Sequence, residues 1–442
     1  MCILEYNIIS MGLIMKKIIL VGLCALLFAT GCSKKQDKNT AAVNENQRGT
    51  LASLVNKGSK TAAESQEAVE DDFVRDSRLC DMAAKYGFKV GACVSYQLAN
   101  RSGYTRLLAN DYNTTTATNE FKAYSLLNQQ KSIQEGKPCM NYAQADAIAK
   151  MAKEKGLGIR GHVLVWDAYM SEWFFRKDFK NDGAIVSKQE LEERLEYYID
   201  QVITHFETEF PGLVYCWDVV NEAVADGSNE WIPGNEFHIR ATRSGTVNMF
   251  NQILGPDYVK FAFECARKTV NKVNPEIKLF YNDYNTFYQD KRDAIIKLIK
   301  YLNSEEKLCD GVGMQGYIGG YGQQAGCMNY NDLSLIKTAI KMYSDLGIEV
   351  QLTEVAVRNY EEGQMDMHAA FYGSLFRTII SACNEGANFT GITIWGITDN
   401  PNMPKNDYSY KMNGPYCGLY TSVYDIKDSY KEVYKVLSEV VF

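Results

Sequence analysis

Short apolar runs alternate with longer amphipathic stretches from residue 73 to the end of the chain. Eight of these runs are rich in β-branched and aromatic residues, which predicts strands over 89–95, 113–118, 158–166, 213–220, 277–283, 311–317, 349–355 and 391–397. The spacing of apolar residues between them predicts helices over 143–155, 188–207, 258–273, 293–302, 333–346 and 368–384. Alternation alone also fits a doubly wound sheet. Eight strand–helix repeats over about 370 residues favour the α/β class in its (β/α)8 TIM-barrel form, with its chemistry at the carboxyl ends of the strands.

The first part of the chain has the pattern of a secretory signal. Lys16 and Lys17 precede an apolar run over 18–30 that is too short to span a bilayer as a helix. Cys32 follows, and this arrangement resembles the lipobox of bacterial lipoproteins. A plain cleaved signal with an ordinary cysteine is the alternative. We expect residues 1–32 to be a signal peptide, with Met15 as the true start and Cys32 as the lipidated residue. An outer-membrane lipoprotein on the periplasmic or cell-surface face is then expected.

Residues 33–72 are polar and poor in aromatic side chains, so they cannot bury enough apolar surface to fold alone. We expect this segment to be a flexible tether between the membrane anchor and a folded domain over residues 73–442.

Composition and short motifs exclude several classes of function. The net charge is −7 and no long run of Lys and Arg is present, so a nucleic-acid partner is not expected. The 12 cysteines include no CxxC pair, so zinc spacing is absent and most of them are expected to be free and buried. Residues 311–316 fit G-x-G-x-x-G, but the motif is itself a predicted strand rather than a turn that opens a helix. We therefore expect no metal and no cofactor. A monomer is also expected.

Two predicted strands end in a glutamate. Glu222 ends the fourth strand and Glu354 ends the seventh. In a barrel, both side chains would point into the mouth, where one protonated and one ionised carboxyl group could hydrolyse a glycosidic bond. The strand pattern alone leaves a second interpretation open, in which each glutamate forms a buried ion pair.

The order of several motifs resembles glycoside hydrolase family 10, which contains the retaining endo-β-1,4-xylanases. The resemblance covers roughly residues 78 to 440 and rests on the runs 160–166, 217–222, 282–285, 353–354 and 395–399, together with Gln315. It implies that Glu222 is the general acid/base and Glu354 the nucleophile of a double displacement on a plant-type β-1,4-glycan, with xylan as the expected polymer. It further implies that His162 and Asp218 form a buried pair beside the acid/base. The implied substrate-binding residues are Asn119, Lys122, His162, Trp166, Tyr169, Asn221, Gln315, Tyr317 and Trp395.

The chain departs from the family pattern at the site itself. Asp167 stands where the family has His, Tyr169 where it has Gln, and Thr118 where it has Glu. A second site Trp is missing, and Tyr408 or Tyr410 is expected to replace it. These departures favour as alternatives the same mechanism on a different β-glycan, or a glycan-binding protein on a decayed barrel. The loops 224–248 and 319–326 are expected to shape the substrate groove.

A paired departure concerns the support of the nucleophile. The family has a His where Tyr317 stands and an Asp where Ala356 stands. An imidazole needs a carboxylate to fix its tautomer, whereas a phenol hydroxyl needs no such partner to act as a donor. We therefore expect Tyr317 to donate a hydrogen bond to Glu354 over about 2.6–3.2 Å. The alternative is a Tyr317 ring that points away and stacks on sugar or packs.

Overall fold

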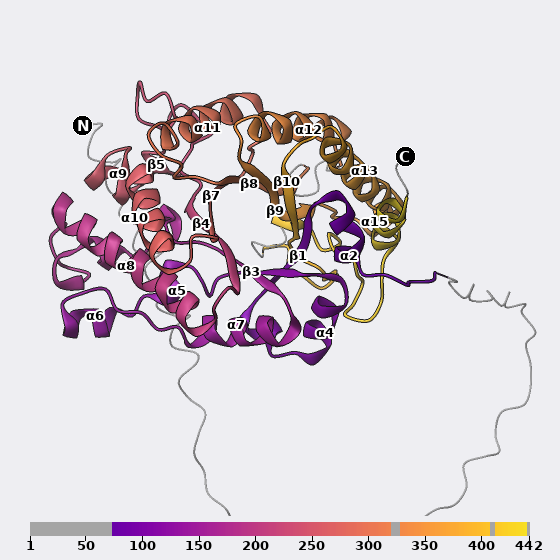
Figure 1. Ribbon diagram of the computed structural model, residues 1–442, viewed down its shortest axis with the longest axis horizontal. Coiled ribbons are helices and arrows are strands. Elements are labelled where there is room, and N and C mark those ends of the chain that lie inside the picture. The colour runs from indigo at the N-terminus through magenta and orange to yellow at the C-terminus, as the bar shows by residue number, and fades with distance from the viewer. Residues whose placement is uncertain (1–72, 320–327, 407–411, 440–442) are drawn as a thin grey trace, which may run out of the picture. The chain divides into compact units, whose positions relative to one another are not determined.

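Eight parallel strands close into a barrel in the computed structural model, which describes residues 73–319, 328–406 and 412–439 (Figure 1). The strands are β1 (Lys89–Val94), β2 (Thr114–Ala117), β3 (Gly158–Gly161), β4 (Val214–Asn221), β7 (Lys278–Asp283), β8 (Gly311–Ile318), β9 (Glu349–Val357) and β10 (Phe389–Ile394). Their order is β1-β10-β9-β8-β7-β4-β3-β2, and β1 pairs with both β2 and β10. This closure confirms the predicted barrel, and it excludes the doubly wound sheet because an open sheet would leave two unpaired edges.

Helices surround the barrel, as expected for strands that are buried on both faces (Figure 1). They are α2 (Leu79–Ala83), α3 (Tyr96–Ala99), α4 (Ser102–Asp111), α5 (Ala123–Leu126), α6 (Gln129–Glu135), α7 (Ala143–Lys155), α8 (Lys188–Glu209), α9 (Met249–Leu254), α10 (Tyr258–Val273), α11 (Gln289–Leu302), α12 (Tyr330–Ser344), α13 (Met365–Asn384) and α15 (Asp428–Ser438). Short 3-10 turns occur at η1 (Ala84–Tyr86), η2 (Asp167–Tyr169), η3 (Glu172–Phe175), η4 (Lys177–Phe179) and η5 (Glu362–Gln364). A separate two-stranded hairpin consists of β5 (Thr242–Arg243) and β6 (Thr246–Val247).

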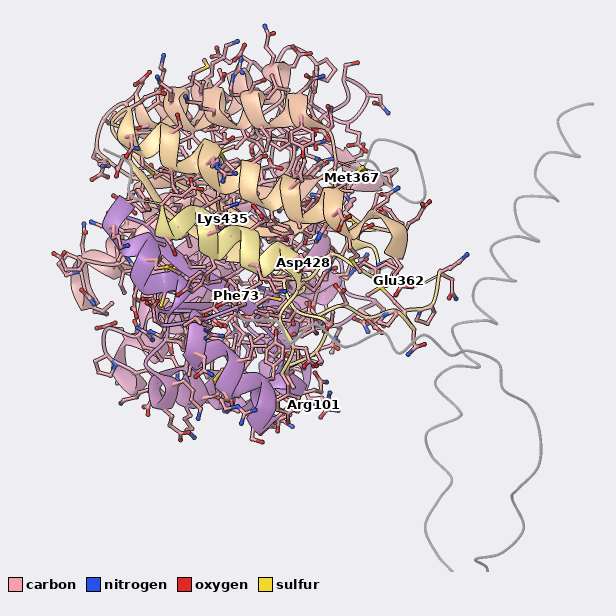
Figure 2. All side chains as sticks on the ribbon, turned by 90° about the vertical axis from the view of Figure 1, so that its right-hand side faces the viewer. Phe73, Arg101, Glu362, Met367, Asp428 and Lys435 are labelled. Carbon is pink, nitrogen blue, oxygen red and sulfur yellow. The ribbon has the colours of Figure 1, made fainter. Side chains whose placement is uncertain are left out.

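The two ends of the barrel domain pack together. Phe73 lies against the rings of Tyr430 and Tyr434 in α15, with centroid distances of 6.4 and 5.2 Å (Figure 2). Asp111, at the end of α4, is buried and accepts hydrogen bonds from Tyr420 over 2.5 Å and from Tyr430 over 2.8 Å. The last helix therefore connects the first described residues to the first part of the barrel.

The third predicted strand, 158–166, is too long. Regular β3 ends at Gly161, although the chain beyond it still follows β4 through hydrogen bonds from the Leu164 and Val165 amides to the Asp218 and Val219 carbonyls (3.1 and 2.9 Å). The continuous apolar character of this segment reflects burial in the barrel mouth rather than regular strand pairing.

The signal peptide and the tether predicted for residues 1–72 lie outside the described residues, as do Tyr408, Tyr410 and most of the loop 319–326. None of the helices in the described ranges is long and apolar enough to cross a membrane. The cysteines within the described ranges are free, and all but Cys383 are buried.

Gly161 lies where β3 meets the ring of Trp217, which is fully buried. A Cβ atom at this position would lie 2.3 Å from the Trp217 ring. Gly161→Ala should therefore force the indole or the strand to move, and it should lower the free energy of unfolding by about 1–3 kcal/mol, as overpacking usually does. Urea unfolding of the purified barrel domain measures this change.

Gly363→Ala is the matched control, because nothing lies within 4 Å of a Cβ atom there. Its free energy of unfolding should stay within about 0.5 kcal/mol of wild type. Equal stability of the two variants would contradict the tight packing of β3 on Trp217.

Candidate active site

Glu222 and Glu354 lie at the carboxyl end of the barrel, where the strand pairing is irregular. Glu222 directly follows β4, and the β4–β7 register shifts between Asp218 and Val220. Glu354 lies in β9, where the β8–β9 register shifts between Gln315 and Tyr317. Both glutamates have a left-handed backbone, with φ of 56° and 54°, which is unusual for residues other than glycine. Strain and bulges of this kind redirect side chains and are typical of functional sites.

One hydrogen-bond network joins the two carboxylates. The Gln315 amide donates to Glu222 Oε1 over 3.0 Å and to Asn221 Oδ1 over 3.3 Å. The Asn282 amide donates to the same Asn221 oxygen over 2.9 Å and to Glu354 Oε1 over 3.2 Å. Each glutamate is only 7% exposed, so these donors offset part of the desolvation of the carboxylates. Strands β4, β7, β8 and β9 all contribute to this arrangement.

Glu354 is surrounded by donors and positive charge. Tyr317 Oη donates to Glu354 Oε2 over 2.7 Å, so the contact expected from the sequence is present. His162 Nε2 lies 3.9 Å from the other oxygen, Glu354 Oε1. Burial raises the pKa of Glu354 above its usual range, whereas His162, the Tyr317 hydrogen bond and Lys122 work in the opposite direction and offset only part of this rise.

The residues paired across β8 and β9 explain how a tyrosine fits at this position. Tyr317 lies opposite Ala356, and Ala356 is fully buried. Arg358, two residues further along β9 and its continuation, donates to the Tyr317 carbonyl over 2.8 Å and lies 5.8 Å from the Tyr317 ring centroid. A carboxylate at position 356 would place a second negative charge near Glu354. This charge would oppose the ionisation of Glu354.

His162 and Asp218 form the expected buried pair, and the other ring nitrogen of His162 lies near Glu354. His162 Nδ1 lies 2.9 Å from Asp218 Oδ2, and Arg160 contacts both oxygens of the same carboxylate over 2.5 and 3.1 Å. Burial would raise the pKa of Asp218, but Arg160 and His162 together lower it below its usual value. An ionised Asp218 orients the ring so that Nε2 points toward Glu354, and no contact joins His162 to Glu222 among the described residues. The buried pair is therefore present, and its placement beside Glu222 stays a prediction.

Aromatic rings flank this polar centre. Trp166 and Trp395 lie edge-on to the His162 ring, at centroid distances of 6.0 and 6.4 Å. Trp166 in turn contacts Tyr169 at 4.4 Å. The structure therefore brings these three predicted binding residues to the same mouth of the barrel.

Lys122 lies next to these rings. Its Nζ is 5.1 Å from the Trp166 ring centroid and 4.5 Å from that of Tyr169, and it donates to Asn119 Oδ1 over 3.1 Å. Burial lowers the pKa of Lys122, and Glu354 and Glu222 oppose this shift. Asn119 itself is exposed, so it lies at the rim of the site.

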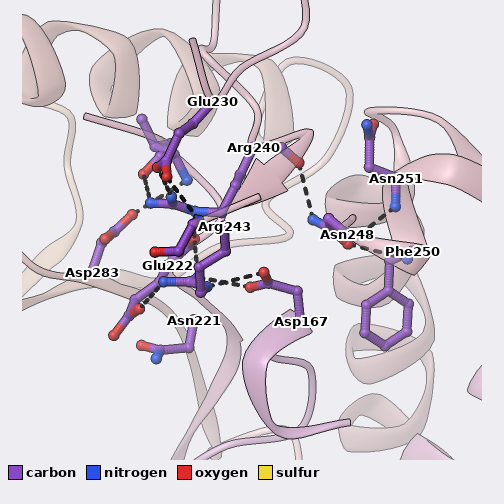
Figure 3. A network of polar contacts seen from close by, with 12 residues as sticks. Asp167, Asn221, Glu222, Glu230, Arg240, Arg243, Asn248, Phe250, Asn251 and Asp283 are labelled. Atoms are coloured by element: carbon purple, nitrogen blue, oxygen red, sulfur yellow. Dashed lines mark hydrogen bonds and ion pairs between the residues drawn. The ribbon is translucent and has the colours of Figure 1, made fainter. Parts of the chain in front are cut away.

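Sequence reasoning missed Arg243, which contacts Glu222 directly. Arg243 Nη1 donates to Glu222 Oε2 over 2.8 Å, and two further nitrogens of the guanidinium bind Asp167 over 2.7 and 3.1 Å (Figure 3). Position 243 lies in a segment that carries no periodic pattern. Asp167 was the signal that could have indicated such a residue, because a carboxylate close to Glu222 needs a positively charged partner.

Two buried donors in the site have no hydrogen-bond partner among the described residues. They are Asn221 Nδ2 and Trp166 Nε1. Because buried polar groups are normally satisfied, both are available to a bound ligand. No group of three or more His, Cys, Asp or Glu side chains in the described ranges could hold a metal ion.

Two carboxylates at the ends of different strands in the mouth of a (β/α)8 barrel define a glycoside hydrolase type of site. The chain belongs to glycosyl hydrolase family 10, whose model matches residues 78–436.

Curated relatives and solved structures agree with this family. Endo-1,4-β-xylanase B of Butyrivibrio fibrisolvens is 31% identical over 320 residues, which cover 71% of this chain and 46% of that protein. Endo-1,4-β-xylanase A of the same organism is 30% identical over 379 residues, covering 80% of this chain and 83% of the relative. The crystal structure of the CBM22-1–GH10 modules of endo-1,4-β-D-xylanase 10B from Clostridium thermocellum, complexed with xylohexaose, matches with a TM-score of 0.71 and 28% identity, over 82% of this chain and 68% of that one. This chain therefore spans less than half the length of the first relative.

The contact between Tyr317 and Glu354 predicts a measurable change in titration. Tyr317→Phe removes a hydrogen bond that favours the ionised form of Glu354, so the pKa of Glu354 should rise further above its usual range. Carbon NMR titration of the protein with labelled Glu carboxyl groups would follow this resonance. Tyr86→Phe is the control, because Tyr86 donates only to the Glu439 carbonyl, on a different part of the chain. An unchanged Glu354 titration in Tyr317→Phe would show that the hydroxyl gives no net stabilisation.

Proposed function

We propose that this protein is a retaining endo-β-1,4-xylanase, which cleaves the backbone of xylan by double displacement. The observation that carries the proposal is the hydrogen-bond network that couples Glu222 and Glu354 across four neighbouring strands. The coupled pair can supply an acid/base and a second carboxylate for glycoside hydrolysis, and membership of glycosyl hydrolase family 10 supports retention of the anomer.

The two carboxyl groups take different parts in the reaction. In the first step, ionised Glu354 attacks the anomeric carbon and Glu222 gives its proton to the leaving glycosidic oxygen. In the second step, Glu222 takes a proton from water, which attacks the same carbon and releases the sugar from Glu354. Tyr317, His162 and Lys122 support the ionised state that Glu354 needs in the first step. Two inversions at one carbon leave the anomer retained.

The unpartnered donors and the rings support a sugar as the ligand. Asn221 Nδ2 is buried beside both carboxylates and is free to donate to a sugar hydroxyl. Trp166 and Trp395 offer apolar faces, which suit the carbon–hydrogen faces of a pyranose ring. Lys122 and Asn119 extend the polar contacts along the same side of the site.

The relatives named above support xylan as the polymer, since their printed activity is that of endo-1,4-β-xylanases. The departures at Asp167 and Tyr169 change the walls of the site but leave the carboxylate pair intact. We further propose, from the sequence pattern alone, that a lipid on Cys32 and the segment 33–72 tether a monomeric enzyme to a bacterial outer membrane.

A polysaccharide panel tests the activity. The wild-type protein should release reducing ends from xylan, and proton NMR of the first products should show the β-anomer before mutarotation. Glu222→Ala should slow xylan cleavage by about 10²–10⁴-fold, because the leaving oxygen loses its proton donor.

Arg176→Gln is a matched surface control, since Arg176 pairs with Glu172 and contacts neither carboxylate. It should leave xylan cleavage unchanged. Inverted first products would contradict the double displacement, and cleavage of another β-glycan in place of xylan would contradict the substrate.

A further inference from the structure

The segment that follows Glu222 folds back over it. Val224 forms an antiparallel bridge with Ile239, and the hairpin of β5 and β6 comes directly after Arg240. The hairpin turns at Ser244 and Gly245, both with positive φ (48° and 82°), as a type I′ turn requires. A stretch without helical or strand periodicity therefore has a defined structure above the barrel mouth.

Arg240 fixes the base of this hairpin. Its side chain is only 1% exposed, and it donates to the backbone carbonyls of Glu222 and Val224, over 3.2 Å in each case. It also forms an ion pair with Glu230, and the Ser244 amide donates to the same Glu230 side chain over 3.0 Å (Figure 3). The base and the tip of the hairpin are thus tied to each other and to the residue that carries the acid/base carboxylate.

Arg243 reaches from the hairpin to that carboxylate. Asp167 binds the guanidinium through two parallel hydrogen bonds, a geometry that fixes an arginine in one orientation. The remaining donors of Arg243 contact Glu222 twice, at Oε2 over 2.8 Å and at the backbone carbonyl over 3.2 Å. Gln315 holds the other oxygen, Oε1. Both oxygens of Glu222 therefore have a donor, one from β8 and one from the hairpin.

We propose that Arg243, anchored by Asp167, is a positioning residue that holds the Glu222 carboxyl group in line with the leaving oxygen; this rests on the proposed function. Burial opposes the charge of Arg243, but its hydrogen bonds to Asp167 and the charge of Glu222 raise its pKa, so the guanidinium stays charged between two acids. Without Arg243, Glu222 Oε2 has no hydrogen-bond donor among the described residues, and the carboxyl groups of Asp167 and Glu222 lose the guanidinium that joins them. The Glu222 side chain would then turn away from its working position.

A surface ion pair without function is the competing interpretation, and such pairs contribute about 0–1 kcal/mol to stability. The Arg243 side chain is 23% exposed, so exposure alone does not separate the two. The two interpretations predict different kinetics for an Arg243 variant. A misplaced acid harms only those reactions that need a proton, whereas general damage to the site harms every reaction equally.

The test uses aryl β-xylobiosides with leaving groups of graded acidity, and kcat/KM, which reports the first chemical step. Arg243→Gln should lower kcat/KM about tenfold or more on xylan and on phenyl xylobioside. On dinitrophenyl xylobioside, whose leaving group departs without a proton, the loss should stay below about twofold. The dependence of kcat/KM on the leaving group should therefore become steeper than in wild type.

Two further variants separate charge from geometry. Asp167→Asn keeps Arg243 but weakens its anchor, and it should show the same steeper dependence. Arg243→Lys keeps the positive charge but loses the planar guanidinium that binds Asp167 and Glu222 at the same time. It should recover less than half of the lost rate on phenyl xylobioside. Arg176→Gln is the matched control, because Arg176 has similar exposure (26%) and pairs with Glu172 outside the site.

Several outcomes would overturn the proposal. For Arg243→Gln, they are an equal loss of kcat/KM on all leaving groups, no loss of kcat/KM, or a gain of kcat/KM on xylan. For Arg243→Lys, the contradicting outcome is full recovery of kcat/KM. Thermal unfolding identifies a variant that fails to fold, and Asp167→Asn then carries the same test. A wild-type protein inactive on xylan and on every xylobioside would instead contradict the proposed function itself.

Discussion

The burial of two acidic side chains in one barrel mouth is the constraint on which the rest of the site depends. A buried carboxylate without donors is strongly destabilising, so each one must meet a fixed set of partners. Here the donors lie on neighbouring strands, with Asn282 on β7 and Gln315 on β8, and both meet at the Asn221 side chain of β4. The order of strands around the closed barrel is therefore what places Glu222 and Glu354 within one network.

The two glutamates differ in what surrounds them. Glu354 contacts a phenol hydroxyl and an imidazole whose orientation is set by the buried Asp218. Glu222 contacts the neutral amide of Gln315 on one side and the charged guanidinium of Arg243 on the other. The two carboxyl groups therefore have different surroundings, and the assignment of Glu222 as the acid/base and Glu354 as the nucleophile rests on the proposed function. Residues of the barrel strands and the segment after β3 surround Glu354. The hairpin beyond β4 contributes Arg243 to the surroundings of Glu222.

The sequence was sufficient for the parts of the molecule that follow local patterns. All eight barrel strands could be predicted, because most of them are short apolar runs and β2 is rich in the β-branched residue Thr. The contact of Tyr317 with Glu354 could be expected from the family resemblance, through the paired change at Tyr317 and Ala356.

The missed features depend on contacts between residues that are distant along the chain. Arg243 meets Asp167, 76 residues away, through a hairpin whose strands have two residues each, too short to show periodicity. The contact of His162 with Glu354 was not predicted, because the orientation of the His162 ring depends on Asp218 and Arg160 across the β3–β4 pair. Such orientations follow from the three-dimensional packing of charged groups rather than from spacing along the sequence.

Under the proposed function, Glu354 forms a covalent bond to the sugar, and trapping this intermediate is a direct test. A 2-deoxy-2-fluoro xylobioside with a dinitrophenyl leaving group slows the second step more than the first, so the glycosyl-enzyme accumulates. Mass spectrometry of the intact protein should then show one added fluoroxylobiosyl group, and peptide mapping should locate it on Glu354. A label on Glu222, or steady turnover of the reagent with no label on the protein, would contradict the role of Glu354 as the nucleophile.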